Sequence, residues 1–416
     1  MRARRSFGIF WLVQTLSVAG DMFSFVAIPL LVLASTGSVA RMGLLTAAAG
    51  VGRIVAGFFA GTIVDRFDRR TLLIGCDAVR AVLLGAVVVS PPWILYVVSP
   101  LSAAAGMVFQ VAYVAAVPSL VELPEARRSG VSAGSGTPDA GPDRITEANG
   151  RLNATYAAAT IAGPMLAGLV SHAFGPAIAI GIDAATFAVS AGGLALIRLR
   201  PSPRGATNPR TDFLVGVRFL ARHPALRSLT VLLTLQIFLT TGLEDVFIYL
   251  LKHDLGQDDR VVGYVLAVAG IGSIVAALIV ARARRRIGFG ACWIGSSAIG
   301  GLALMLIGVG HTLALVAALA TVFTFSLGVG GVCSMSLRQQ VTPGELLGRV
   351  TAAFWTVHYA LAPAGAALLT ALAGRLGAPV VCLAAGVGCV AVAAAALLTP
   401  VRLPHPETAF ATPFPK

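Results

Sequence analysis

The sequence predicts an all-α membrane protein whose twelve transmembrane helices form two six-helix bundles. Three observations support this fold class: the composition, the number of long apolar stretches, and a repeat that relates the two halves of the chain. Of the 416 residues, 57% are hydrophobic and only 12% are charged. Soluble proteins carry about 25% charged residues. The composition therefore excludes a water-soluble enzyme or binding module, and also a disordered chain.

Twelve apolar stretches have the length of a membrane-spanning helix, about 20 residues. They are 7–33, 41–63, 71–90, 93–118, 150–172, 177–197, 227–251, 260–281, 289–309, 312–336, 349–373 and 378–399. A long basic segment separates the sixth from the seventh. We therefore expect an N-terminal six-helix bundle over 1–197, a basic cytoplasmic linker over 198–226, and a C-terminal bundle with a short tail over 227–416.

The basic residues predict the orientation. With a cytoplasmic N-terminus, 25 of the 31 Lys and Arg residues fall in the N-terminal tail, the inner loops and the C-terminal tail, and four fall in the outer loops. Inner loops of membrane proteins are enriched in Lys and Arg, so both termini are expected in the cytoplasm. This topology also explains the net charge of +13 without a nucleic-acid partner.

An internal repeat supports two parallel halves. Residues 43–56 and 263–276 share eight of fourteen residues at an offset of 220, including Gly50-x-Gly52 and Gly270-x-Gly272. Both segments run in the same direction across the membrane, as expected for parallel repeats in one large class of transporters. No strand precedes the Gly-x-Gly pairs, so we interpret them as helix-contact faces rather than nucleotide sites.

A charged motif lies between the second and third stretches. It reads Gly61-Thr-Ile-Val-Asp65-Arg66-Phe-Asp68-Arg69-Arg70 and resembles the signature loop of the major facilitator superfamily, which usually has Gly at the position of Asp68. The resemblance implies a gate latch formed by Gly61, Asp65, Arg66, Arg69 and Arg70. Asp65 can cap the third helix, and the arginines can pair with neighbouring helix ends. The alternative is an ordinary basic turn with an incidental Asp65.

Further segments resemble the macrolide-efflux and siderophore-exporter branch of that superfamily. Gly163, Pro164 and Gly168 in the fifth stretch are similar to the Gly-Pro motif of its exporters, with Ala159 where a further glycine is expected. Other similar segments are 11–17, 36–38, 148–153, 338–343 and 348–349. The resemblance implies the major facilitator fold, export from the cell, and a bacterial inner-membrane location.

Ionisable residues inside membrane spans are costly and often functional. Asp21 lies near the middle of the first stretch, on a polar stripe with Gln14, Ser17 and Ser24. Arg53 lies at a similar depth in the second stretch. We expect Asp21 and Arg53 to face a central cavity, where Asp21 carries a coupling proton. The alternative is a permanent ion pair that only joins the two helices.

The seventh stretch carries a second polar region. Glu244 and Asp245 could share protons, form an outer gate, or cap the helix at the membrane surface. Gln236 and Thr241 are further candidates for lining the cavity. On the third stretch, Asp77 and Arg80 are expected to pair with each other by their helical spacing.

These features predict a secondary transporter that exports small amphipathic molecules, a drug or a secondary metabolite, by alternating access with proton antiport. The alternatives are a nutrient importer of the same superfamily and, less favoured, a polytopic enzyme acting on lipid-linked substrates. We find no nucleophile–base pair or metal-ligand cluster in the sequence, and we expect no enzyme activity, metal or cofactor. The expected partners are the substrate, protons and the lipid bilayer, with the chain acting as a monomer.

Overall fold

A computed structural model of the chain describes residues 2–121, 140–197, 209–310, 312–343 and 346–409. Within these ranges, the side chains of 2–7, 65, 114–121, 140–154 and 209–212 are left undescribed. Every regular element of the described residues is a helix. The all-α prediction is therefore confirmed.

The first six predicted stretches correspond to helices α1 to α6. They are α1 (Arg2–Thr36), α2 (Val39–Arg66), α3 (Arg69–Val89), the short 3₁₀ helix η1 (Pro92–Ile94), α4 (Leu95–Val121), α5 (Ala140–Phe174) and α6 (Pro176–Leu196). The remaining elements are α7 (Pro209–Arg222), α8 (Pro224–Thr240), α9 (Leu243–Tyr249), the π-helical turn η3 (Leu250–Asp254), α10 (Asp259–Val309), α11 (Leu313–Val341), α12 (Leu347–Tyr359), α13 (Ala362–Leu376), α14 (Ala378–Ala396), η4 (Pro400–Arg402) and α15 (Pro406–Ala409).

The described residues contain eleven helical stretches that are long and apolar enough to cross a membrane. One of them, α10, has 51 residues. At 1.5 Å per residue it would be about 76 Å long, more than twice the apolar thickness of a bilayer. Gly288 breaks α10 with a φ of 80°, between the predicted stretches 260–281 and 289–309. The helix is therefore two spans, and twelve spans result, as predicted.

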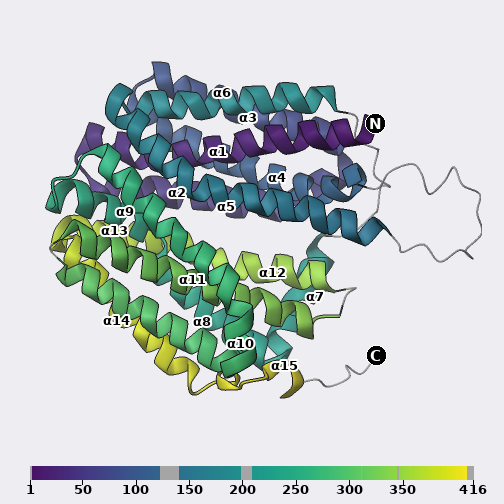
Figure 1. Cartoon of the computed structure of the whole chain (residues 1–416), viewed down its shortest axis with the longest axis vertical. Coiled ribbons are helices and arrows are strands. Elements are labelled where there is room, and N and C mark those ends of the chain that lie inside the picture. Colours follow the sequence, from purple (N-terminus) through teal and green to yellow (C-terminus); the bar gives the residue numbers. More distant parts are fainter. Residues whose placement is uncertain (1, 122–139, 198–208, 311, 344–345, 410–416) are drawn as a thin grey trace, which may run out of the picture.

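The helices form two groups that lie side by side (Figure 1). Helices α1 to α6 pack among themselves, as do α8 to α14, and the groups meet mainly where α2 contacts α13 and α5 contacts α10. The repeated glycines lie at equivalent contacts. A Cβ on Gly52 would overlap Pro100 of α4, and a Cβ on Gly272 would overlap Thr321 of α11. Only glycine permits these close helix approaches.

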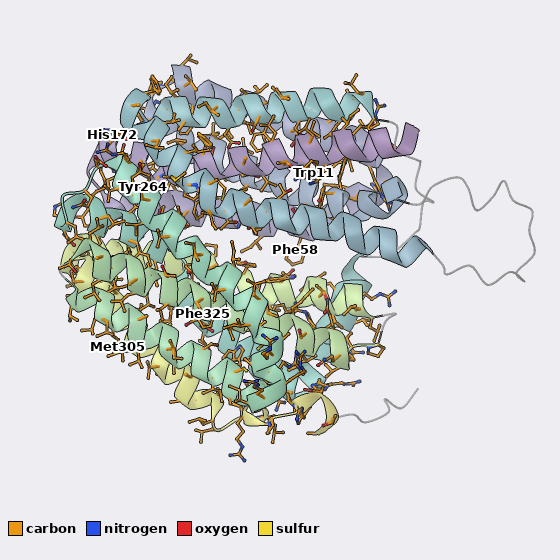
Figure 2. All side chains as sticks on the ribbon, viewed as in Figure 1. Trp11, Phe58, His172, Tyr264, Met305 and Phe325 are labelled. Atoms are coloured by element: carbon orange, nitrogen blue, oxygen red, sulfur yellow. The ribbon has the colours of Figure 1, made fainter. Side chains whose placement is uncertain are left out.

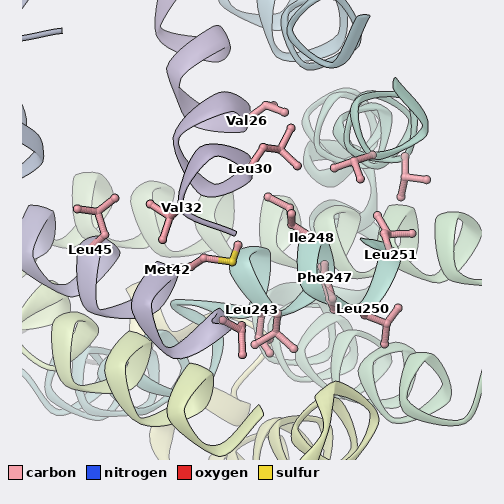
Figure 3. Packing of buried hydrophobic residues seen from close by; sticks show 14 of the residues in the cluster. Val26, Leu30, Val32, Met42, Leu45, Leu243, Phe247, Ile248, Leu250 and Leu251 are labelled. Atoms are coloured by element: carbon pink, nitrogen blue, oxygen red, sulfur yellow. The ribbon is translucent and has the colours of Figure 1, made fainter. Parts of the chain in front are cut away.

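Arg2 and α15 lie at one end of the molecule (Figure 1). We name this the basic end, because the α2–α3 turn and the arginines around Gly288 also lie there; the other is the opposite end. Figure 3 shows one apolar core at the opposite end that joins both halves, with Leu30 of α1 and Met42 of α2 packed near Leu243 and Ile248 of α9. At the basic end each half has a separate core. The halves therefore share an apolar core only at the opposite end, although α2 also contacts α7 and α12.

The segment expected to be a plain linker contains a packed helix. Within 198–226, the residues from 209 onward form α7 and the start of α8. Phe219 of α7 is buried in the core of the C-terminal half, and a Cβ on Gly216 would overlap the carbonyl of Arg349 at α12. An amphipathic sequence can bury its apolar face against a neighbouring helix, and α7 does so on α12. Residues 198–208 lie outside the description.

Candidate functional site

The start of α3 is capped by Asp68. The Asp68 carboxylate accepts hydrogen bonds from the Thr71 amide at 3.0 Å and from its hydroxyl at 3.2 Å. Asp68 is the residue immediately before the helix, where a side chain reaches the first free amides. The expectation that Asp65 caps α3 stays a prediction. The side chain of Asp65 lies outside the description.

The arginines of this motif differ in their surroundings. The Arg70 guanidinium donates to the carbonyls of Leu194, at 3.4 Å, and Ala195 at the end of α6. The expected pairing of an arginine with a neighbouring helix end is thus confirmed for Arg70, where a cation meets unpaired carbonyls. Arg66 is exposed, Arg69 is half-buried, and a Cβ on Gly61 would meet nothing within 4 Å.

Asp21 pairs with Arg80 of α3 and not with Arg53. The Arg80 guanidinium donates to Asp21, and its Cζ lies 3.7 Å from the centre of the Phe187 ring on α6. The side chain of Arg80 is 13% exposed and that of Asp21 is 37% exposed. Two expected ion pairs are therefore wrong for this conformation. Asp21 does not pair with Arg53, and Asp77 does not pair with Arg80.

The polar stripe of α1 faces the interior of the N-terminal bundle. Ser24 donates a hydrogen bond to Asp183 of α6, and a Cβ on Gly20 would overlap Thr186 of the same helix. Ser17 is buried, 1% exposed, and Gln14 is half-buried. The expectation that the stripe faces a central cavity is wrong, because helix spacing shows which residues share a face and not which neighbour covers it.

Asp77 and Asp183 complete a cluster of carboxylates around Arg80. Both are fully buried. Asp183 accepts hydrogen bonds from Ser24 and, at 3.4 Å, from the Thr186 hydroxyl. Neither oxygen of Asp77 has a hydrogen-bond partner among the described residues. Three carboxylates thus surround one guanidinium, which we name the carboxylate cluster: Asp21, Asp77, Asp183 and Arg80.

Glu244 and Asp245 follow a break in the seventh span. Helix α8 ends at Thr240, and Gly242 takes a φ of 94° against Ala366 of α13 before α9 starts. Asp245 is 3% exposed and accepts a hydrogen bond of 2.7 Å from the Thr46 hydroxyl of α2. Glu244 is half-buried, with one oxygen lacking a hydrogen-bond partner among the described residues. Asp245 therefore joins the two halves and is not a surface cap.

Residues of both halves meet around Arg53. Arg53 (α2) and Tyr156 (α5) interact electrostatically with Tyr359 of α12, on which the Trp355 ring stacks at 5.6 Å. The side chains are exposed, Tyr156 by 57% and Trp355 by 41%. Figure 2 shows Phe58 of α2 between the halves, nearer the basic end. We name Arg53, Tyr156, Trp355 and Tyr359 the central cluster.

Only Arg53 of the central cluster was among the predicted residues. The aromatic pairs Phe354-Trp355 and His358-Tyr359 in one span were a usable signal, since each pair brings a polar atom into an apolar stretch. Of the other candidates, Gln236 and Thr241 are half-buried. Thr241 immediately follows α8, so the helix ends between Gln236 and the carboxylates Glu244 and Asp245.

The exporter-like glycines lie at helix contacts. A Cβ on Gly163 would overlap Met22 of α1, and one on Gly168 would lie 2.8 Å from the Cα of Gly263 in α10. Pro164 is inside α5, and its carbonyl would lie 2.5 Å from a Cβ on Gly263. These residues let α5 approach α10 across the interface between the halves.

Comparisons with known proteins agree with this architecture. A family profile described as Major Facilitator Superfamily matches residues 10–366. The chain is 28% identical over 394 residues to the multidrug efflux pump Tap of Mycobacterium tuberculosis, covering 88% of this chain and 89% of that protein. It is 25% identical over 370 residues to the Tap pump of Mycolicibacterium fortuitum, covering 86% and 87% of the two chains.

The fold also resembles solved transporter structures. The crystal structure of the nucleoside transporter NupG superposes with a TM-score of 0.74, at 11% identity, over 96% of this chain and 99% of that one. Such a likeness concerns the fold alone. The profile match over most of the chain and the twelve spans identify this protein as a member of the major facilitator superfamily, a membrane transporter and not an enzyme.

Proposed function

We propose that the protein exports small amphipathic molecules from the bacterial cytoplasm by alternating access, in exchange for protons. The observation that carries the proposal is the central cluster, where Trp355 and Tyr359 of one half lie near Arg53 and Tyr156 of the other. Exposed aromatic faces bind apolar and aromatic groups, and Arg53 can hydrogen-bond a polar or acidic group. The relatives named multidrug efflux pumps support the same substrate class.

The conformation is consistent with loading from the cytoplasm. The halves share a core at the opposite end, whereas each has its own core at the basic end. The distribution of Lys and Arg favours a cytoplasmic basic end, with both termini inside. In the proposed cycle the contacts of Gly163, Pro164 and Gly168 with α1 and α10 open for release. The motif of Gly61, Asp65, Arg66, Arg69 and Arg70 then latches the basic end.

Protons are the proposed driving ions, because the described spans hold carboxylates that are poorly compensated by cations. Asp21, Glu244 and Asp245 are the candidates predicted from the sequence. Carboxylates removed from water bind protons more readily unless a cation or hydrogen-bond donors stabilise the charge. Conformational changes that alter their hydration would therefore take up and release protons.

Everted membrane vesicles from a pump-deficient bacterial host test the proposal. The vesicles are tested with a panel of lipophilic dyes: the cation ethidium, a neutral dye and an anionic dye. Energised vesicles that contain the protein should accumulate at least one of these dyes, and a protonophore should abolish the accumulation. Tyr359→Ala should weaken apparent affinity for the transported dye about 5–10-fold, the effect of losing one aromatic contact of about 1 kcal/mol. Trp93→Ala is the matched control, since Trp93 is 64% exposed outside the central cluster.

Three results would contradict parts of the proposal. Net uptake into intact cells, driven by the same gradient, would favour a nutrient importer. Accumulation that persists with the protonophore would remove the proton coupling. An effect of Trp93→Ala as large as that of Tyr359→Ala would remove the central cluster from substrate binding.

A further inference from the structure

Asp77 is a buried carboxylate that forms no ion pair with a described residue. It is 0% exposed, and neither oxygen accepts a hydrogen bond from the described residues. Arg80 follows it by three positions, one helical turn, but donates to Asp21 instead. The Nε of Arg80 is buried and has no hydrogen-bond partner among the described residues. An ionised carboxylate in such a place is strongly disfavoured.

Ser190 of α6 and the charge of Arg80 both act on Asp77, but each effect is smaller than the effect of burial. Helix α3 packs against α6 and α4. The ionisable residue within α6 is Asp183, and α4 contributes no charged side chain over its described part, 95–113. On α3 itself the neighbours are Cys76 and Arg80. The carboxylate cluster therefore holds three acids and one cation, an arrangement that favours a bound proton.

We propose that Asp77 holds a proton in this conformation, and that Arg80 exchanges its partner from Asp21 to Asp77 when that proton leaves. The O–H bond of Asp77 breaks, the proton passes to water at the basic end, and the new carboxylate attracts the guanidinium. Asp21 loses its partner and takes a proton from the opposite side when the proposed cycle opens that side. Transfer of that proton from Asp21 to Asp77 returns Arg80 to Asp21, so each cycle carries one proton toward the basic end.

The positions of the two acids suit this exchange. Asp77 lies eight residues after the start of α3 at the basic end, about 12 Å along the helix, and Asp21 is farther from that end. The side chain of Asp21 is 37% exposed, whereas Asp77 is fully buried. The guanidinium of Arg80 lies between the Phe187 ring and Gly106. A Cβ added to Gly106 would lie 3.7 Å from the Cζ of Arg80. Its guanidinium can turn toward a residue one helical turn away while the stem stays in place.

Infrared difference spectroscopy of the purified full-length protein tests the exchange without any substrate. The wild type at neutral pH should show a carboxylic-acid C=O band from protonated Asp77. Asp77→Asn should lose that component. Asp21→Asn should lose it too, because Arg80 then turns to Asp77 and ionises it. Asp254→Asn, an exposed carboxylate at the opposite end, is the control and should retain the full band.

The outcomes are distinct. A band unchanged in Asp77→Asn shows that Asp77 is not the proton holder, and a band that survives in Asp21→Asn overturns the exchange. Asn resembles a protonated acid in shape, so Asp77→Asn should keep the wild-type unfolding temperature; a large fall would show that Asp77 is ionised. The transport cycle rests on the proposed function, but the spectra do not. Vesicles without pH-driven transport would refute that function and leave the spectroscopic result valid.

Discussion

Arg80 of α3 joins Asp21 of α1, fifty-nine positions earlier in the chain. The pair crosses the interior of the N-terminal bundle, with the Phe187 ring of α6 stacked on the guanidinium. Three helices therefore meet at one cation. A cation in such a place is stable only while at least one nearby carboxylate compensates its charge.

Neutralising both acids near Arg80 should cost much more than neutralising either one. Asp21→Asn leaves Asp77 as a partner one helical turn away, and Asp77→Asn leaves Asp21, so each single variant should lower the unfolding temperature little. The double variant leaves Arg80 with neither. We expect a non-additive loss, with a coupling of about 1–3 kcal/mol, measured by thermal unfolding of the four proteins in detergent. Additive effects would show that Arg80 does not move between the acids.

Asp68→Ala should weaken the α2–α3 turn. The Asp68 carboxylate caps α3 through the Thr71 amide at 3.0 Å, and losing such a cap costs about 1 kcal/mol. Asp68→Asn keeps an oxygen acceptor and should be close to wild type in thermal unfolding. If Asn is as damaging as Ala, the charge matters and the cap does not.

Gly263→Ala should loosen the opposite end. The added Cβ would lie 2.5 Å from the carbonyl of Pro164 and 2.9 Å from the Cα of Gly168, and backbone atoms cannot move away cheaply. Hydrogen–deuterium exchange should rise in peptides covering 39–46 and 243–250. Gly192→Ala is the matched control, since nothing lies within 4 Å of its Cβ. Equal exchange in both variants would contradict a tight α5–α10 contact.

The stability of the protein should fall in mild acid because of His223. Its Nδ1 accepts a hydrogen bond of 3.3 Å from the Leu226 amide at the start of α8, which requires the neutral ring. Burial lowers the pKa of His223 below its ordinary value of 6.5. His223 therefore binds a proton more tightly in the unfolded chain than in the folded protein. Its contribution to the free energy of unfolding is complete above pH 6.5 and declines as the pH falls toward the lowered pKa. The decline in unfolding temperature between about pH 7 and 5 should be smaller in His223→Asn, which keeps the acceptor but does not titrate.

Composition and periodicity were sufficient to predict the spans. Long apolar stretches must form helices in a bilayer, since every backbone group needs a partner, and the break at Gly288 lies between two predicted stretches. The repeated glycines were recognisable because close helix contact constrains the residue type. The latch motif was found by resemblance, and the contact of Arg70 with the end of α6 agrees with one of its expected roles.

Tertiary structure alone decided which charges meet. Asp21 and Arg53 have similar depths in sequential helices, yet Asp21 pairs with Arg80, because α1 turns its polar stripe toward α6 and α3. The sequence shows which residues share a face of a helix, but the neighbour of that face depends on how all the helices pack. The same reason separates Asp77 from Arg80, joins Asp245 to Thr46 across the two halves, and brings Tyr359 to Arg53.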